Sequence, residues 1–365
     1  MTSEVLFTPS HSSGKDDSLT LRVLEMLDSL GFADALHEGD SVAVKVHPGE
    51  KNNISYLRPS IACAIAERLS ERGLEPFVTE TTTLYSRQRF TRGELLHTSA
   101  GNGYTAETLG CPFVVADSGP DVEVRLDGRR LKTVGVASRI AGADALLVLS
   151  HFTCHCWMAG VGGAIKQLGM GCVGRRTKTE VHRSTDITIQ DELCVGCGTC
   201  LDVCKSEGIT LGEAAAINDD CVRCGVCIGA CPEQAIGFRH DLEHFAEALG
   251  EAAAGAASCF EKSRAAYLNF LLDVTWHCDC EDFSDDPVFP DIGVLASLDP
   301  VAVDQASADL VNSRAPNPGT MADKPEVRDA KDKIFALSNI EWWRQLDSAE
   351  RVGLGSRDYE LKNLN

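Results

Sequence analysis

Along the first 80 residues, the spacing of apolar positions switches between the helical and the strand period. Apolar residues three or four positions apart predict a first helix: Leu19, Val23, Met26, Leu27 and Leu30. Residues 41–47 then alternate valines with Lys45 and His47, which predicts a strand with these two polar residues on one face. A helix over residues 59–73 and a strand over residues 76–80 follow. The chain therefore opens as β/α units.

The same alternation continues through most of the chain. Short apolar runs predict further strands at residues 113–117, 133–136, 145–150, 267–275 and 292–297. An alanine-rich helix is expected from about Leu242, and Asp299-Pro300 is expected to cap another. Alternation of this kind predicts an α/β fold with a largely parallel sheet and helices on both faces.

Two cysteine runs interrupt this pattern. Each run has the form CxxCxxCxxxC, and together they contain Cys194, Cys197, Cys200, Cys204, Cys221, Cys224, Cys227 and Cys231. In ferredoxins with two clusters, three cysteines of one run and the last cysteine of the other ligate the same cluster. We therefore assign Cys194, Cys197, Cys200 and Cys231 to one [4Fe-4S] cluster, and Cys221, Cys224, Cys227 and Cys204 to the second. Zinc, which also favours CxxC, is the alternative.

The cysteine runs define a small ferredoxin-like α+β insert within the α/β domain. We expect the first part of that domain at residues 1–185, the insert at 186–241, the second part at 242–315 and a helical tail at 316–365. The insert holds ten Asp and Glu against three Lys and Arg. An acidic docking face for a basic redox partner protein follows as a hypothesis.

Composition limits the surroundings of the protein. Of the sixteen cysteines, eight lie in two motifs that oxidation would destroy, which indicates a reducing compartment, and the start of the chain has no signal-peptide pattern. No apolar run is long enough to cross a bilayer. The net charge of -20 disfavours nucleic acid and anionic membranes as partners. We expect a soluble cytoplasmic protein.

Several segments resemble the family named after the domain of unknown function 362, over about residues 1–315. The matching segments are His47-Pro48-Gly49-Glu50, residues 83–87, residues 150–152, residues 160–171, Cys278-Asp279-Cys280, residues 291–293 and residues 299–304. Members of this family commonly carry the ferredoxin insert. Where the family usually has a Lys-Gly pair after His-Phe, this chain has Thr153-Cys154, so a role carried by that lysine would be absent here.

Polar residues follow the ends of the predicted strands, where open α/β sheets bind ligands. This edge is expected to gather His47, Glu80, Asp117, His151, residues 277–280 and Asp299. The glycines Gly160, Gly162 and Gly163 precede a helix, and with His47 they are candidates for binding a cofactor, although close helix packing explains them equally well. The candidate catalytic residues are Tyr85 as a proton donor, Arg87 and Lys166 for an anionic group, and His151.

A second group of cysteines suggests a third metal site. Cys154 and Cys156 follow one predicted parallel strand, and Cys278 and Cys280 follow another. Both pairs should therefore emerge at the same edge of the sheet, where four soft ligands suit zinc or a further iron-sulfur centre, with His151, His155 or His277 in reserve. Packing of small buried side chains is the alternative.

Two functions fit these patterns. In the first, the clusters deliver electrons to a small molecule or cofactor bound at the strand ends, as in an oxidoreductase. In the second, the protein is an electron carrier or maturation factor without its own catalysis that docks on a larger oxidoreductase. Polar residues at the strand ends favour the first, and the lack of a flavin, nicotinamide or radical-SAM motif favours the second.

Overall fold

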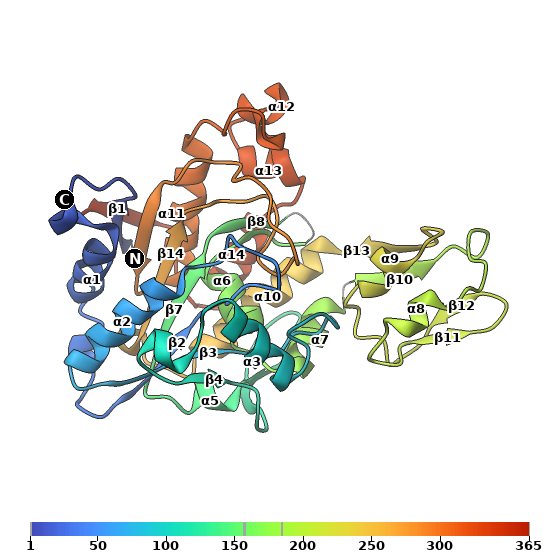
Figure 1. Ribbon diagram of the computed structural model, residues 1–365, viewed down its shortest axis with the longest axis horizontal. Coiled ribbons are helices and arrows are strands. Elements are labelled where there is room, and N and C mark those ends of the chain that lie inside the picture. The colour runs from blue at the N-terminus through green and yellow to red at the C-terminus, as the bar shows by residue number, and fades with distance from the viewer. Residues whose placement is uncertain (1, 156–157, 184, 365) are drawn as a thin grey trace.

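The computed structural model describes residues 2–155, 158–183 and 185–364 (Figure 1). Within this part of the chain, the main sheet has eight strands in the order β16-β1-β15-β14-β7-β2-β3-β4. Their bounds are β1 Ser3–Pro9, β2 Ser41–Lys45, β3 Glu75–Glu80, β4 Phe113–Val115, β7 Ala145–His151, β14 Ala265–Leu271, β15 Gly293–Ser297 and β16 Tyr359–Asn363. The α/β fold with a mostly parallel sheet is confirmed.

Helices cover both faces of this sheet because the central strands β7, β14 and β15 are buried on both sides. On one face, Val42, Val44, Leu147 and Leu268 pack against α1 (Leu19–Ser29) and α2 (Pro59–Glu71). On the other face, alternate strand residues pack against α10 (Leu242–Ala257), α11 (Pro300–Ser313) and α14 (Trp343–Arg351). Strands buried on both faces read as continuous apolar runs, as β7 does.

The remaining helices of the body have at most ten residues and surround these layers. They are α3 Arg92–Gly101, α4 Ala106–Leu109, α5 Ser138–Ala141, α6 Ala164–Lys166, α7 Arg175–His182, α12 Pro325–Arg328 and α13 Lys333–Ser338. Two small hairpins lie outside the main sheet: β5 (Val122–Arg125) with β6 (Thr133–Val136), and β8 (Thr153–His155) with β9 (Gly160–Gly162).

One strand runs against the others, and this changes the position of Asp299. β15 is antiparallel to β14 and to β1, so its carboxyl end lies at the opposite edge from the ends of β2, β3, β7 and β14. Asp299 therefore lies away from the expected edge. Its carboxylate caps α11 and accepts hydrogen bonds from the Ser3 hydroxyl (2.7 Å) and the Ser356 amide (2.8 Å).

The two ends of the chain meet at one margin of the sheet. β16 pairs in parallel with β1, so the last residues, expected to be helical, also contribute a strand. Neither strand was predicted. Tyr359 and Leu361 of β16 have polar neighbours and are only partly buried, which leaves little of the apolar signal that identifies a strand.

The cysteine module, defined here as β10 (Thr185–Ile189) through β13 (Ile236–His240), projects from one side of the body (Figure 1). It contains α8 (Thr199–Asp202), α9 (Val226–Ala230) and the strand pair β11 (Ile209–Leu211) and β12 (Ala215–Ile217). Its small core is made of six buried residues, including Cys200 and Cys227, with Ile187 and Ile236 from the two outer strands. None of the helices in the described part of the chain has the length and apolar character that a bilayer crossing requires.

The module is expected to be dispensable for folding of the body. β10 and β13 are paired antiparallel with Thr185 opposite His240, so the two connections to the body lie side by side. Replacing residues 186–241 by a short Gly/Ser linker should leave one cooperative thermal transition, measured by circular dichroism. A broad transition without cooperativity would show that the body depends on the module.

Candidate functional site

A cavity of about 650 Å³ lies at the carboxyl edge of the parallel strands, between the body and the cysteine module. This volume falls within the usual range of ligand sites, about 300–1,000 Å³. The body contributes His47, Glu80, Tyr85, His151, Lys166, Cys278 and Cys280 to its wall, and the module contributes Arg223, Cys224, Gly225, Gly229 and Phe238. The strand ends therefore converge on one site, as expected, and Asp117 supports it by accepting hydrogen bonds from Thr82.

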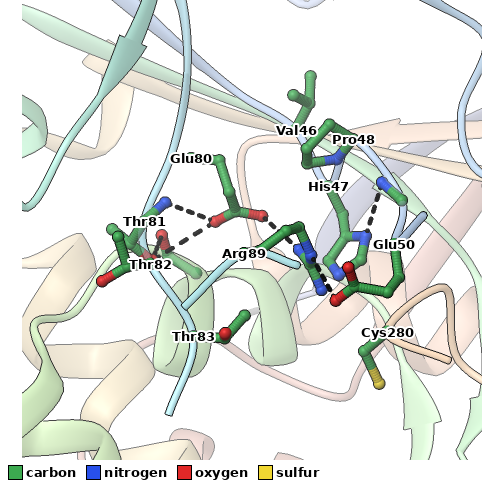
Figure 2. Close-up of polar contacts among 12 residues, drawn as sticks. Val46, His47, Pro48, Glu50, Glu80, Thr81, Thr82, Thr83, Arg89 and Cys280 are labelled. Atoms are coloured by element: carbon green, nitrogen blue, oxygen red, sulfur yellow. Dashed lines mark hydrogen bonds and ion pairs between the residues drawn. The ribbon is translucent and has the colours of Figure 1, made fainter. Parts of the chain in front are cut away.

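A chain of buried charges, of which Figure 2 shows Glu80, Arg89 and Glu50, forms the floor of this site. Lys45 lies 2.8 Å from the Glu80 carboxylate, which also faces Arg89 at 3.9 Å, and Arg89 lies 3.3 Å from Glu50. All four side chains are almost fully excluded from solvent. Alternation of sign lets each ion compensate its neighbour, which offsets the large cost of burying charge. Arg89 belongs to no periodic pattern in the sequence. Only its position two residues after Arg87 connects it with the predicted site.

His151 is held on both ring nitrogens. Nδ1 lies 2.8 Å from the Asp279 carboxylate and Nε2 lies 2.7 Å from the Leu272 carbonyl. Burial alone would lower the pKa of His151, but Asp279 and the carbonyl raise it above its ordinary value. With both nitrogens occupied as donors, His151 anchors the Cys278–Cys280 segment and has no ring atom left for a substrate proton.

His47 and Tyr85 face the cavity in neutral form. His47 Nδ1 accepts a hydrogen bond from the Gly49 amide, which leaves the ring proton on Nε2. Burial, reinforced by Arg89, lowers the pKa of His47 well below its ordinary value. Burial raises the pKa of Tyr85, whose hydroxyl accepts from Arg89 and keeps its own proton to donate. A neutral His47 ring and a protonated Tyr85 hydroxyl thus face the cavity.

Arg87 is occupied by the protein itself. Its guanidinium donates to the Glu281 carboxylate at 2.7 Å and to the Cys280 carbonyl at 3.0 Å. These contacts secure the turn that carries Cys280, and they compete with the expected contact to an anionic ligand.

The glycine-rich segment packs closely, and its helix start is already filled. The Asp304 carboxylate accepts from the amides of Ala164 (2.7 Å) and Ile165 (2.9 Å), the groups that would otherwise hold an anion. A side chain at Gly163 would collide with Asp304, and one at Gly160 would collide with Trp342. Gly162 and Gly163 line the cavity, so the segment contributes shape rather than an anion-binding helix end.

The thiols of Cys278 and Cys280 meet His155 in the cavity wall. One ligand atom from each of these residues lies within 4.8 Å of the others, a spacing at which a metal ion can be held, and no other such group occurs in the described residues. Lys166 Nζ lies 2.9 Å from Cys278 Sγ. The expectation that a segment after β7 meets the segment after β14 is fulfilled, because these strands are parallel neighbours.

Cys154 does not join this group. In β8 successive side chains point to opposite faces, so Thr153 and His155 line the cavity while Cys154 belongs to the hydrophobic core. The predicted grouping of four cysteines is therefore corrected: His155, and not Cys154, lies beside Cys278 and Cys280. Cys156 lies outside the described residues.

The eight cysteines of the module gather in two groups of four. Cys194, Cys197, Cys200 and Cys231 line one small cavity, which combines three cysteines of the first run with the last of the second. Around Cys227 the neighbouring thiols are Cys224, Cys221 and Cys204; burial first, and then these thiols, raise its pKa to about 12. This is the crossed arrangement assigned from the spacing.

The thiols within these two groups lie farther apart than the sulfurs that surround a single metal ion. Four sulfurs around one zinc, at about 2.3 Å each, lie about 3.8 Å apart. No three of the eight thiols come within 4.8 Å of one another in the described part of the chain. The described module thiols therefore form no three-membered group as tight as a single zinc ion requires.

A mixed α/β domain that carries a cysteine-rich module at its strand-end cavity defines the class of protein. The model of a family described as "Domain of unknown function (DUF362)" matches residues 42–309, more than half of the chain. The chain therefore belongs to the DUF362 family.

Two further comparisons add little. A comparison with curated proteins finds no match. Among solved structures, the chain is similar to the lactate racemase apoprotein from Thermoanaerobacterium thermosaccharolyticum, with 12% identity and a TM-score of 0.35. That match covers 75% of this chain and 51% of the other, so this chain spans about half the length of that protein.

Lys178 lies in the cavity wall, nearly fully buried. Its ammonium donates to the Thr81 hydroxyl at 2.7 Å and to the Thr82 carbonyl. Burial, only partly offset by Asp117 and Glu80, lowers its pKa to about 8. An amine that exchanges its proton near neutral pH is suited to bind anions or transfer protons.

The titration of Lys178 should appear as a pH-dependent stability. Between pH 8 and 10.5 the unfolded chain keeps the lysine proton while the folded chain releases it, so folding is favoured as pH rises through this window. The burial penalty, on the order of 3 kcal/mol, is complete below pH 8. The free energy of unfolding of the wild type, measured against Lys178→Met from pH 7 to 10, should therefore increase. A difference that does not change with pH would contradict this pKa.

Proposed function

We propose that this protein is an iron-sulfur redox protein whose two [4Fe-4S] clusters deliver electrons to a small molecule bound in the strand-end cavity. Cys194, Cys197, Cys200 and Cys231 hold one cluster, and Cys221, Cys224, Cys227 and Cys204 hold the other. The clusters supply one electron at a time. The crossed grouping of the thiols and their wide spacing support this assignment.

The observation that carries the proposal is the shared wall of the cavity. Cys224, a ligand of the second cluster in this proposal, lines the same cavity as Tyr85, Lys178 and Cys278. Two contacts hold the body and the module together near Cys204. The Ser86 hydroxyl donates to the Val203 carbonyl at 2.9 Å, and Lys205 pairs with Glu94 at 3.2 Å. A cluster placed at a substrate cavity supports electron delivery to a bound molecule over storage.

The residues of the body prepare this molecule for reduction. Tyr85 supplies a proton from a hydroxyl that Arg89 holds in place. Lys178, Lys166 and Arg223 add positive charge to the wall, which favours an anionic substrate. The arrangement is that of an oxidoreductase in which electrons enter from the module and protons come from the body.

A carrier that docks on a larger oxidoreductase is the second candidate. The observation in its favour is the acidic excess of residues 186–241, ten acidic against three basic residues. Leu193 and Val195, beside the first cysteine group, are exposed and extend this surface. In our proposal the same face receives electrons from a basic donor protein, so docking and catalysis use opposite sides of the module.

Metal analysis tests the clusters. Protein purified without oxygen should hold about eight irons and eight sulfides per chain, since each cubane has four of each. Cys231→Ser should disturb the cluster of Cys194, Cys197 and Cys200 and leave the other reducible by electron paramagnetic resonance. Cys259→Ser, outside both groups, is the matched control and should change neither. A preparation that binds only tetrahedral zinc after reconstitution contradicts the assignment.

Filling the cavity tests the substrate site. Gly229 lines it, and a side chain added there meets no heavy atom within 4 Å, so Gly229→Phe should occupy the cavity without displacing the cysteines. This variant should keep its iron and lose any small molecule that co-purifies with the wild type, measured by mass spectrometry. Gly93→Phe, exposed and equally open but outside the cavity, should keep the molecule. Retention in Gly229→Phe would place the molecule elsewhere.

A further inference from the structure

Cys278 lies among hydrogen-bond donors in the wall of the cavity. Its sulfur accepts from Lys166 Nζ at 2.9 Å and from the Cys280 amide at 3.3 Å. Hydrogen bonding from the Cys280 thiol first, and then Lys166 and His155, lowers the pKa of Cys278 well below its ordinary value, against the effect of burial. Donors on several sides of one sulfur stabilise a thiolate, the nucleophilic form of cysteine.

The tautomer of His155 distinguishes a thiolate site from a metal site. Its Nδ1 accepts from the amides of Met158 (3.4 Å) and Ala159 (3.3 Å), so the neutral ring carries its proton on Nε2. His155 therefore acts toward Cys278 as a donor. A histidine that binds a metal through one nitrogen normally donates from the other, which is the opposite arrangement.

The turn that carries both thiols is held rigidly. The Asp279 carboxylate, between them, binds His151 at 2.8 Å and Ser55 at 3.3 Å on the side of the body. The Glu281 amide closes the turn on the Cys278 carbonyl at 3.0 Å. With Asp279 anchored, Cys278 and Cys280 face each other, within 4.8 Å sulfur to sulfur. A small rotation of the side chains would form a disulfide between them.

We propose that Cys278 and Cys280 form a dithiol-disulfide couple that collects two electrons from the clusters and passes them as a pair to a low-molecular-weight disulfide bound in the cavity. The inference rests on the proposed electron delivery and names its acceptor. Two one-electron centres match the two-electron demand of a disulfide. Cys224 and both thiols line the same cavity, so the proposed cluster and the dithiol adjoin the same bound molecule.

The steps balance. Two electrons break the bond between Cys278 and Cys280, leaving a thiolate beside Lys166 and a Cys280 thiol that takes one proton from solvent. The Cys278 thiolate attacks one sulfur of the substrate, whose disulfide bond breaks, and the first thiolate leaves with the proton that Cys280 gives up. Cys280 then attacks Cys278, which releases the second thiolate to take a proton from solvent and restores the disulfide. In sum, one disulfide, two electrons and two protons give two thiols.

The class of substrate follows from the cavity. Its volume of about 650 Å³ admits a small molecule and excludes a folded protein. Lys178 and Arg223 in the wall favour a disulfide that carries carboxylates. Glutathione disulfide and cystamine, an anionic and a cationic disulfide, are therefore the informative pair of probes.

Mass spectrometry reads the couple directly, without an activity assay. Cleavage after Arg264 and Arg314 gives a peptide in which Cys278 and Cys280 are the only cysteines. Full-length holoprotein exposed to glutathione disulfide should yield this peptide with an internal disulfide. In Cys280→Ser, Cys278 should instead keep glutathione as a mixed disulfide. Cys278 should form this mixed disulfide at least tenfold faster than Cys63 does, and faster than Cys278 reacts with cystamine. Labelling of Cys278 no faster than that of Cys63, or a preference for cystamine, would overturn the substrate assignment.

Lys166 supplies a second readout. In Lys166→Met carrying Cys280→Ser, labelling of Cys278 should fall about tenfold at pH 7 and recover at higher pH, because the thiol must then ionise without the ammonium. A merely structural role for Lys166 predicts a loss that pH does not restore. Loss of one equivalent of zinc in Cys278→Ser would identify a metal site and overturn the dithiol.

The electron route is tested separately. Protein with the Cys278–Cys280 disulfide is mixed with reduced methyl viologen, and the disulfide is followed in the wild type and in Cys224→Ser. Reduction at least tenfold slower in Cys224→Ser supports transfer through the module. Equal rates would overturn the proposed electron delivery but not the dithiol. If the clusters can be reduced but Cys278 and Cys280 never form a disulfide, the dithiol alone is overturned.

Discussion

The site depends on the compensation of buried charge at the ends of parallel strands. Lys45, Glu80, Arg89 and Glu50 lie beneath the cavity with almost no contact with solvent, in an order that alternates sign. Loss of one of these ions would leave its neighbour uncompensated, at a cost of about 3–5 kcal/mol. The cavity can lie open above these four residues because each buried ion is stabilised by its neighbour instead of by water.

The parallel direction of the strands brings the reactive side chains to this edge of the sheet. β7 and β14 are adjacent and parallel, so the segments after them, with His155 and with Cys278, meet at one edge. The module leaves the body after α7 and returns at α10, which places Cys224 in the wall of the same cavity as the two thiols. Tyr85, Cys224 and Cys280 thus line one cavity although Tyr85 and Cys280 are 195 positions apart in the chain.

The proposed chemistry also explains why hydrogen bonding at the thiols matters more than their number. A cysteine in an apolar wall would be inert, as burial makes Cys172, whose pKa it raises to about 12. Cys278 differs because Lys166 and His155 point donors at its sulfur. The same residue type is thereby assigned to packing in one place and to reactivity in another.

The sequence by itself determined the α/β class and the parallel strands from Ser41 to Leu271, because these follow from apolar periodicity, which is local. It also predicted from fixed spacing how the eight module cysteines divide between two clusters. Tertiary structure decided the rest. The reversal of β15 moved Asp299 to the far edge, strand alternation put His155 in place of Cys154, and His151 was committed to Asp279. Each depends on which distant segments become neighbours, and only packing of the whole chain sets that.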